Sequence, residues 1–170
     1  AIGKFLVGPV VAYTSQNVTV YQDWFPRSAL ELIFDLEADR IRDLNIVPEI
    51  VESERGVIAS ERRNGVDANN PGLLNEQLWA TAFTAHPYQW PVVGWMKDLE
   101  RITRDEMVDY FRTYYAPNNC ILLLVGDFDA ADAKAKIAQA FGSIPRQTPP
   151  PAPVNAEQEQ NGERRAAVRY

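Results

Sequence analysis

The chain has 170 residues, of which 46% are hydrophobic, and it carries a formal net charge of −6. This length and apolar content suit one globular domain with a real core, or one domain and a tail. The acidic balance, without a basic stripe interleaved with aromatic residues, argues against nucleic acid as a partner. The single cysteine excludes an intrachain disulfide and a cysteine-based zinc cage. No apolar run reaches the roughly eighteen residues of a membrane span.

The first predicted elements are two β-strands, which run from Val10 to Ser15 and from Val18 to Phe25 and are rich in β-branched and aromatic residues. Gln16-Asn17 between them forms either a tight turn or a bulge. Pro26 then begins a helix, for which Ser28 is the expected cap. Apolar residues follow at helical spacing to about residue 44.

A second helix has Pro48 in its first turn, where the missing N–H costs nothing. At 100° per residue, Glu54 and Glu61 lie on the same face as four apolar residues of this helix. The four are Val47, Ile50, Val57 and Ile58. A carboxylate directed at a core is costly unless it pairs with a cation, binds a proton or coordinates a metal. Two of them, two turns apart, indicate a site that faces inward. The alternative is that both lie at the rim of the stripe or pair with a buried arginine such as Arg40.

The opposite face of this helix is predicted to face solvent, and so are Arg62 and Arg63. It carries Glu52, Arg55, Ala59 and Arg63. Asn64-Gly65 either ends the helix or kinks it. A third helical stripe ends at His86-Pro87, because the residue before a proline avoids helical geometry. That stripe consists of Leu73, Leu74, Gln77, Leu78, Thr81, Ala82 and Phe83.

Thr103-x-x-Glu106 is a capping-box signature, which predicts a helix that continues to about Tyr115. Cys120 to Val125 is a continuous apolar run, the pattern of a strand that is covered on both faces. Cys120 is therefore expected to be an inert thiol in the core.

A last helix is predicted from about Ala130 to Phe141, with Asp127 and Asp129 as caps. Residues 145–163 contain five prolines among mostly polar residues, which predicts an extended linker and no packed element. Residues 164–170 are typical of the start of a new strand. This order of elements predicts an α+β fold in which helices pack on a mostly antiparallel sheet.

Several short segments, in the same order along the chain, resemble the pitrilysin/insulinase family of zinc metallopeptidases, which includes relatives of mitochondrial processing peptidase. These enzymes carry an inverted His-x-x-Glu-His motif. The segments are Ala12–Ser15 with Thr19–Tyr21, Leu36–Arg40, Glu54–Arg63, His86–Tyr88, Pro91–Gly94, Tyr114–Asn119, Val125–Phe128 and Phe141–Pro145.

The resemblance implies a role for each matching position. Glu61 matches the third protein ligand of the zinc ion, beside two histidines, with a fourth position left for water. Glu54 matches an acidic residue of the site that orients the ligands and balances charge without binding the metal. Ala12, Tyr13, Thr14 and Ser15 match an edge strand whose backbone pairs with an extended peptide substrate. The family usually has an asparagine just before this strand, where this chain has Val11.

The largest departure from the family pattern is that no His-x-x-Glu-His occurs in these residues. That motif supplies two zinc ligands and the general base that takes a proton from the attacking water. His86 follows a helix, precedes a proline and matches a loop position, so it is expected to be structural or exposed. For the chain alone, we therefore expect neither tight zinc binding nor peptidase activity.

The resemblance also implies a division of the chain and its partners. Residues 1–145 are the distal part of an N-terminal peptidase domain, 146–163 a linker and 164–170 the start of the next unit. The intact protein is expected to bind one zinc ion and to cleave extended peptides, and its expected partner is a second homologous half or subunit. The first alternative is a non-catalytic binding or scaffolding homologue that pairs with an active subunit. The second is an unrelated α+β domain whose acidic helix pairs with buried arginines.

Overall fold

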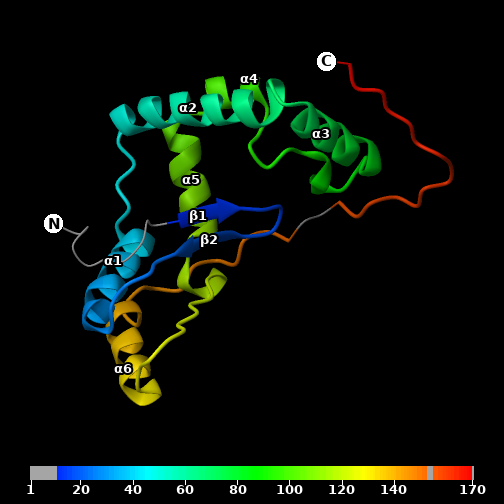
Figure 1. Ribbon diagram of the computed structural model, residues 1–170. Helices are drawn as coiled ribbons and strands as arrows, with labels where there is room; N and C mark the ends of the chain where they lie inside the picture. The colour runs from blue at the N-terminus through cyan, green and yellow to red at the C-terminus, as the bar shows by residue number, and fades with distance from the viewer. Residues whose placement is uncertain (1–10, 153–154, 170) are drawn as a thin grey trace. The chain divides into compact units, whose positions relative to one another are not determined.

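The structure, a computed structural model, describes residues 11–152 and 155–169 (Figure 1). The chain divides into two compact units. One comprises Ala1–Asn45 and Val108–Pro150, and the other comprises Ile46–Met107 and Pro151–Tyr170. The chain passes between the units at three places, and one of them, between Met107 and Val108, falls within a helix, α5 (Arg104–Tyr114). Among the described residues, no helix is long and apolar enough to cross a membrane.

The first unit begins with a β-hairpin of β1 (Val11–Thr14) and β2 (Thr19–Gln22). The strands are antiparallel, with Val11 opposite Gln22 and Thr14 opposite Thr19. The Ser15 N–H donates to the Val18 carbonyl over 2.9 Å and closes the loop. The predicted pair of strands is confirmed, although each is shorter than the sequence pattern indicated.

The helix predicted after Pro26 begins as a short 3₁₀ turn, η2 (Arg27–Ala29), and continues as α1 (Leu30–Arg42). No side chain caps either start, so the expectation that Ser28 caps the helix is wrong. The buried face of α1 packs against α6 (Ala130–Phe141). It consists of Leu30, Ile33, Phe34 and Ala38. The rings of Phe34 and Phe141 meet edge to face, 6.2 Å apart.

Of the two aspartates expected to cap α6, one does so. Asp129 accepts a hydrogen bond from the Asp132 N–H over 2.8 Å. Asp127 instead forms an exposed ion pair with Arg27 over 3.4 Å.

The apolar run Cys120–Val125 follows the 3₁₀ turn η5 (Pro117–Asn119) and forms no strand within the described residues. Cys120 is exposed, and Ile121, Leu123 and Val125 are between 83% and 93% exposed. The expectation of a covered strand and a core thiol is therefore wrong for this chain, because no described strand lies beside the run. An apolar run indicates that these residues favour burial, but it does not show whether the chain contains a strand or helix that covers them.

The second unit contains α2 (Pro48–Arg62), α3 (Asn70–Ala82), η4 (Pro87–Gln89) and α4 (Met96–Arg101). The π-helical turn η3 (Arg63–Asp67) continues from α2, at the place where the sequence predicted an end or a kink. The capping box at the start of α5 is confirmed. The Thr103 N–H donates to the Glu106 carboxylate over 2.7 Å, and the Glu106 N–H donates back to the threonine hydroxyl over 3.3 Å.

Helix α3 begins with Asn69 as its cap, which accepts a hydrogen bond from the Gly72 N–H over 3.0 Å. Gly72 lies so close to η3 that a Cβ there would be 2.0 Å from the Gly65 carbonyl oxygen. The leucine stripe of this helix is not buried: Leu74 is 62% exposed and Leu78 is 61% exposed. The stripe correctly predicted a helix, and these two leucines lie on its exposed surface.

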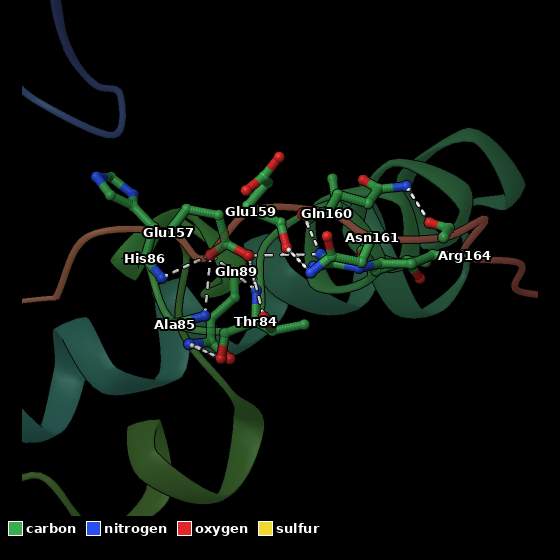
Figure 2. A network of polar contacts seen from close by, with 12 residues as sticks. Thr84, Ala85, His86, Gln89, Glu157, Glu159, Gln160, Asn161 and Arg164 are labelled. Atoms are coloured by element: carbon green, nitrogen blue, oxygen red, sulfur yellow. Dashed lines mark hydrogen bonds and ion pairs between the residues drawn. The ribbon is translucent and has the colours of Figure 1, made fainter.

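Residues 155–163 form no helix or strand, as expected of a linker, and residues 164–169, which were expected to begin a new strand, form none either. Two side chains of residues 155–169 nevertheless bind the end of α3 and the turn after it (Figure 2). Glu157 accepts hydrogen bonds from residues 84–86. Arg164 donates to the carbonyls of Thr81 and Ala82. The expectation that the linker does not pack is therefore wrong for this part of it.

Candidate functional site

Glu54 and Glu61 both lie on the exposed face of α2. Two apolar residues share this face, Ile50 at 54% exposure and Val57 at 47% exposure. The prediction that both carboxylates point into the core of this chain is wrong. The prediction that they share one face with apolar residues holds, so the helix presents two carboxylates within an open, partly apolar strip.

The face that α2 actually buries lies one residue further round the helix. Val51, Ala59 and Arg62 are buried, and Arg55 and Ile58 are partly buried. Helix α2 contacts α4 and, through η3, lies next to α3. Arg55 and Arg62 repeat with the same spacing as Glu54 and Glu61, shifted by one position. A hydrophobicity pattern places arginines on the solvent side of a helix. The buried face predicted for α2 is therefore rotated by about 100° from the face that the structure buries.

Arg62 is 6% exposed and is held by three groups from different segments. Its Nη1 donates to Glu76 of α3 and to the Gly94 carbonyl, over 2.8 Å in each case. Its Nη2 lies 3.2 Å from Asp67 at the end of η3. The guanidinium also lies over the ring of Trp95, 5.5 Å from its centroid. The expectation that Arg62 is solvated is wrong, because a paired guanidinium is buried at much lower cost than an isolated one.

This network fixes the end of α2 at the residue next to Glu61. The hydrogen bond with Glu76 raises the pKa of Arg62, so the guanidinium that holds this network together stays charged at every physiological pH. Two turns earlier, Arg55 donates to the Ile102 carbonyl over 2.6 Å and to Glu52 over 2.8 Å. Sequence reasoning missed both anchors. The only available signal was that two arginines recur at the same spacing as the two glutamates.

The described residues do not by themselves form a complete metal site. No group of three or more His, Cys, Asp or Glu side chains gathers among residues 11–152 and 155–169. Within the same ranges, Glu61 forms no hydrogen bond or ion pair, so its oxygens are free to bind a cation. A carboxylate oxygen suits zinc as one ligand of three or four. The described residues can therefore supply one zinc ligand, the Glu61 carboxylate, and they do not supply a complete zinc site.

The other candidate site segment, Ala12–Ser15, occupies β1 and the residue after it. Ala12, Tyr13 and Thr14 are exposed, and Ser15 is partly exposed. Strand β1 pairs with β2 along one edge, and no other described strand lies on its second edge. Its backbone can therefore accept another strand there. This segment belongs to the first unit, whereas Glu54 and Glu61 belong to the second.

His86 has a structural role among the described residues. Its Nδ1 accepts a hydrogen bond from the Tyr88 N–H over 3.2 Å, at the start of η4. Its ring packs against Tyr88, 4.3 Å between centroids, at the edge of an aromatic cluster that includes Trp79 and Phe83. This agrees with the expectation that His86 is structural.

Residues 5–94, more than half of the chain, match the family model described as Insulinase (Peptidase family M16). The chain belongs to this family. Residues 101–169 match a second model, described as the Peptidase M16 inactive domain. The family assignment that the order of motifs suggested is confirmed.

Relatives in this family are named as zinc proteases and processing peptidases. The chain is 31% identical over 159 residues to zinc protease PqqE of Helicobacter pylori, covering 92% of this chain and 36% of the relative. It is 27% identical over 133 residues to a probable mitochondrial-processing peptidase subunit beta of Schizosaccharomyces pombe, covering 78% and 29%. The crystal structure of a protease from Helicobacter pylori superposes with a TM-score of 0.93 at 30% identity, covering 98% of this chain and 40% of that one. The chain thus spans about a third of the length of the relatives it matches.

Proposed function

We propose that the full-length protein that contains this chain is a zinc metalloendopeptidase that cleaves peptides bound in extended form. The observation that carries the proposal is the pair Glu54 and Glu61, which lie two turns apart on the open face of α2. An exposed strip that mixes carboxylates with Ile50 and Val57 suits a face that completes a site with other residues. The family assignment gives that site its chemistry.

Each carboxylate has a distinct role in this proposal. Glu61 provides one oxygen ligand to the zinc ion, and Arg62, clamped beside it, fixes the end of the helix from which that ligand projects. Glu54 stays off the metal, where it orients the ligands through hydrogen bonds and balances the charge of the ion. When bound, zinc polarises the scissile carbonyl and lowers the pKa of a water molecule.

The edge strand supplies the substrate contacts. Among the described residues, no strand lies on the second edge of β1, so the stretch from Ala12 to Ser15 offers its outward-facing backbone groups there. The Ser15 N–H is not among them, because it donates to Val18 within the hairpin. An extended peptide that adds to this edge gains main-chain hydrogen bonds without regard to its sequence. This mode of binding selects peptides that are unfolded or can become extended, and it leaves side-chain preference to other surfaces.

The chain alone is proposed to be inactive. It lacks His-x-x-Glu-His, and hence two metal ligands and a general base. Those groups are expected in the rest of the full-length protein, since this chain spans about a third of its relatives. A second homologous half or subunit is the expected partner, on the other side of a Pro-rich linker over residues 146–163.

The test is hydrolysis of an unstructured, fluorogenic peptide by the full-length protein. The wild type should cleave it, a chelator should stop cleavage and added zinc should restore it. Glu61→Gln keeps the size of the side chain and removes its charge, so it should abolish cleavage, whereas Glu49→Gln on the first turn of the same helix should not. Cleavage that survives Glu61→Gln at the wild-type rate would rule out the proposed role of Glu61.

The alternative is a non-catalytic homologue that binds or supports an active subunit. The match of residues 101–169 to a model described as an inactive domain does not decide between the two, because the relative named zinc protease PqqE also matches 92% of this chain. Under this alternative, the full-length protein cleaves nothing alone and increases cleavage when its partner subunit is added. The first approach is to read the sequence upstream of Ala1: an intact His-x-x-Glu-His favours the peptidase, and replaced histidines favour the scaffold.

A further inference from the structure

The turn that follows α3 presents three consecutive backbone N–H groups to a single carboxylate (Figure 2). The N–H groups of Ala85 and His86 each donate to Oε2 of Glu157 over 2.9 Å. The N–H of Thr84 lies 3.0 Å from both carboxylate oxygens, and its hydroxyl donates to Oε1 over 3.0 Å. Four donors from three neighbouring residues therefore converge on one side chain that lies more than seventy positions further along the chain.

Such a cluster of successive N–H groups is a concave site for anions, because each amide carries a partial positive charge and its hydrogen points inward. Hydrogen bonds to a charged acceptor are about twice as strong as those between neutral groups. The Glu157 side chain is 22% exposed, so water competes only in part for its oxygens. The backbone N–H groups of His86, Ala85 and Thr84 lower the pKa of this carboxyl from 4.5 to about 2.

A second contact of the opposite charge lies on the last turn of α3. Nη1 of Arg164 donates to the Ala82 carbonyl over 2.6 Å and to the Thr81 carbonyl over 3.2 Å. These carbonyls are among the last of the helix, where no later N–H is available and a cation is favoured. Arg164 also lies 3.4 Å from Glu157, so the two contacts support each other.

We propose that Thr84, Ala85 and His86 form a carboxylate-binding site for the linker, and that Glu157 and Arg164 together strap residues 155–169 to the C-terminal end of α3. In this strap, each charged side chain binds backbone groups of the opposite partial charge. Its anion binds the free N–H groups just past the helix, and its cation binds the free carbonyls of the last helical turn. Neither the family assignment nor the proposed zinc site requires this contact.

The strap has a consequence for the full-length protein. Residues 145–163 would otherwise be an extended, Pro-rich spacer that is attached to the rest of the chain only at its N-terminal end. With both contacts made, the chain beyond Arg164 starts from a fixed place on the unit that also carries α2. The linker therefore acts as a positioning device for whatever follows it.

Hydrogen exchange of the 170-residue chain at neutral pH tests this strap. Glu157→Gln removes the charge and replaces one of the two acceptor oxygens by an NH2 group. The amides of residues 84–86 should therefore exchange about tenfold faster or more. Glu159→Gln is the matched control, since it removes the same charge two residues away from the site. Its exchange at residues 84–86 should equal that of the wild type.

A second variant keeps the proposal falsifiable if Glu157→Gln perturbs the fold. Arg164→Gln removes the cation that pairs with Glu157, so the amides of residues 84–86 should again exchange faster while the centre of α2 keeps its protection. Unchanged protection of residues 84–86 in Glu157→Gln would overturn the proposal, and so would an equal loss in Glu159→Gln. The outcome does not depend on zinc, so failure of the strap and failure of the proposed peptidase are separate results.

Discussion

At the scale of single residues, the important neighbours are Glu61 and Arg62, which point to different faces of α2. The carboxylate is exposed, and the guanidinium is buried between Glu76, Asp67 and the Gly94 carbonyl. Adjacent helical positions are separated by about 100°, so the two side chains do not pair with each other. Arg62 fixes the end of the helix, and the Glu61 carboxylate beside it remains available to bind a cation.

Arg62→Met should destabilise the unit that contains α2 by about 3 kcal/mol, because it leaves Glu76 without its buried partner. Chemical denaturation followed by circular dichroism measures this. Arg63→Met is the control, since Arg63 is exposed and should change stability by less than about 0.5 kcal/mol. Equal effects of the two substitutions would show that Arg62 is not a buried anchor.

The strap should also depend on pH through Glu157. Its pKa is lowered by the backbone N–H groups of His86, Ala85 and Thr84, so the released linker binds a proton more readily than the attached one. The stabilisation is therefore complete above about pH 5 and disappears as the pH falls towards 2. Among the charged and titratable groups nearby, Arg164 touches the carboxylate, while the ring of His86 points away from it and Glu159 lies further along the linker (Figure 2).

Amide chemical shifts of residues 84–86, followed by NMR between pH 6 and the onset of acid unfolding, check this dependence. The wild type and Glu159→Gln should show the same acid-induced change. Glu157→Gln should lack it. A pH curve for Glu157→Gln that matches the wild type would assign the change to another group.

At the scale of elements, the sequence located helices and the hairpin well and assigned their buried faces less well. The capping box at Thr103, the cap at Asp129 and the turn between β1 and β2 depend on local chemistry, which a sequence shows directly. The buried face of α2 depends on which partners meet its arginines, and those partners come from η3, α3 and the segments on either side of α4. Local patterns do not contain that information.

The close approach of η3 and α3 gives a sharp prediction. A methyl group at Gly72 would lie 2.0 Å from the Gly65 carbonyl oxygen, so Gly72→Ala should cost about 2 kcal/mol of stability by forcing the two segments apart. Gly65→Ala is the matched control, because nothing lies within 4 Å of a Cβ there. Thermal denaturation of both variants compares them, and a Gly72→Ala variant as stable as Gly65→Ala would contradict the observed packing.

At the scale of the whole molecule, the chain leaves much of its apolar surface open. Ile121, Leu123 and Val125 in one unit, and Leu74 and Leu78 in the other, are each more than 60% exposed. The sequence located these apolar segments, and it did not show whether other parts of the chain cover them. The same reasoning applies to Glu54 and Glu61: the motif order indicated a shared site, and the described residues supply only part of the site that we propose.

The isolated chain should therefore bind zinc weakly. Isothermal titration with a zinc salt should give no stoichiometric binding at submicromolar affinity, because the described residues contain no cluster of three metal-binding side chains. Tight binding of one zinc ion per chain would mean that these residues form a site by themselves.

The central claim is that Glu61 is one ligand of a zinc site in the full-length protein, and zinc content measures it most directly. The metal retained after dialysis should be one ion per protein in the wild type and should be lost in Glu61→Gln. Glu54→Gln should retain the metal, since that carboxylate is proposed to stay off the ion. Undiminished zinc in Glu61→Gln would contradict the claim and favour the scaffolding alternative.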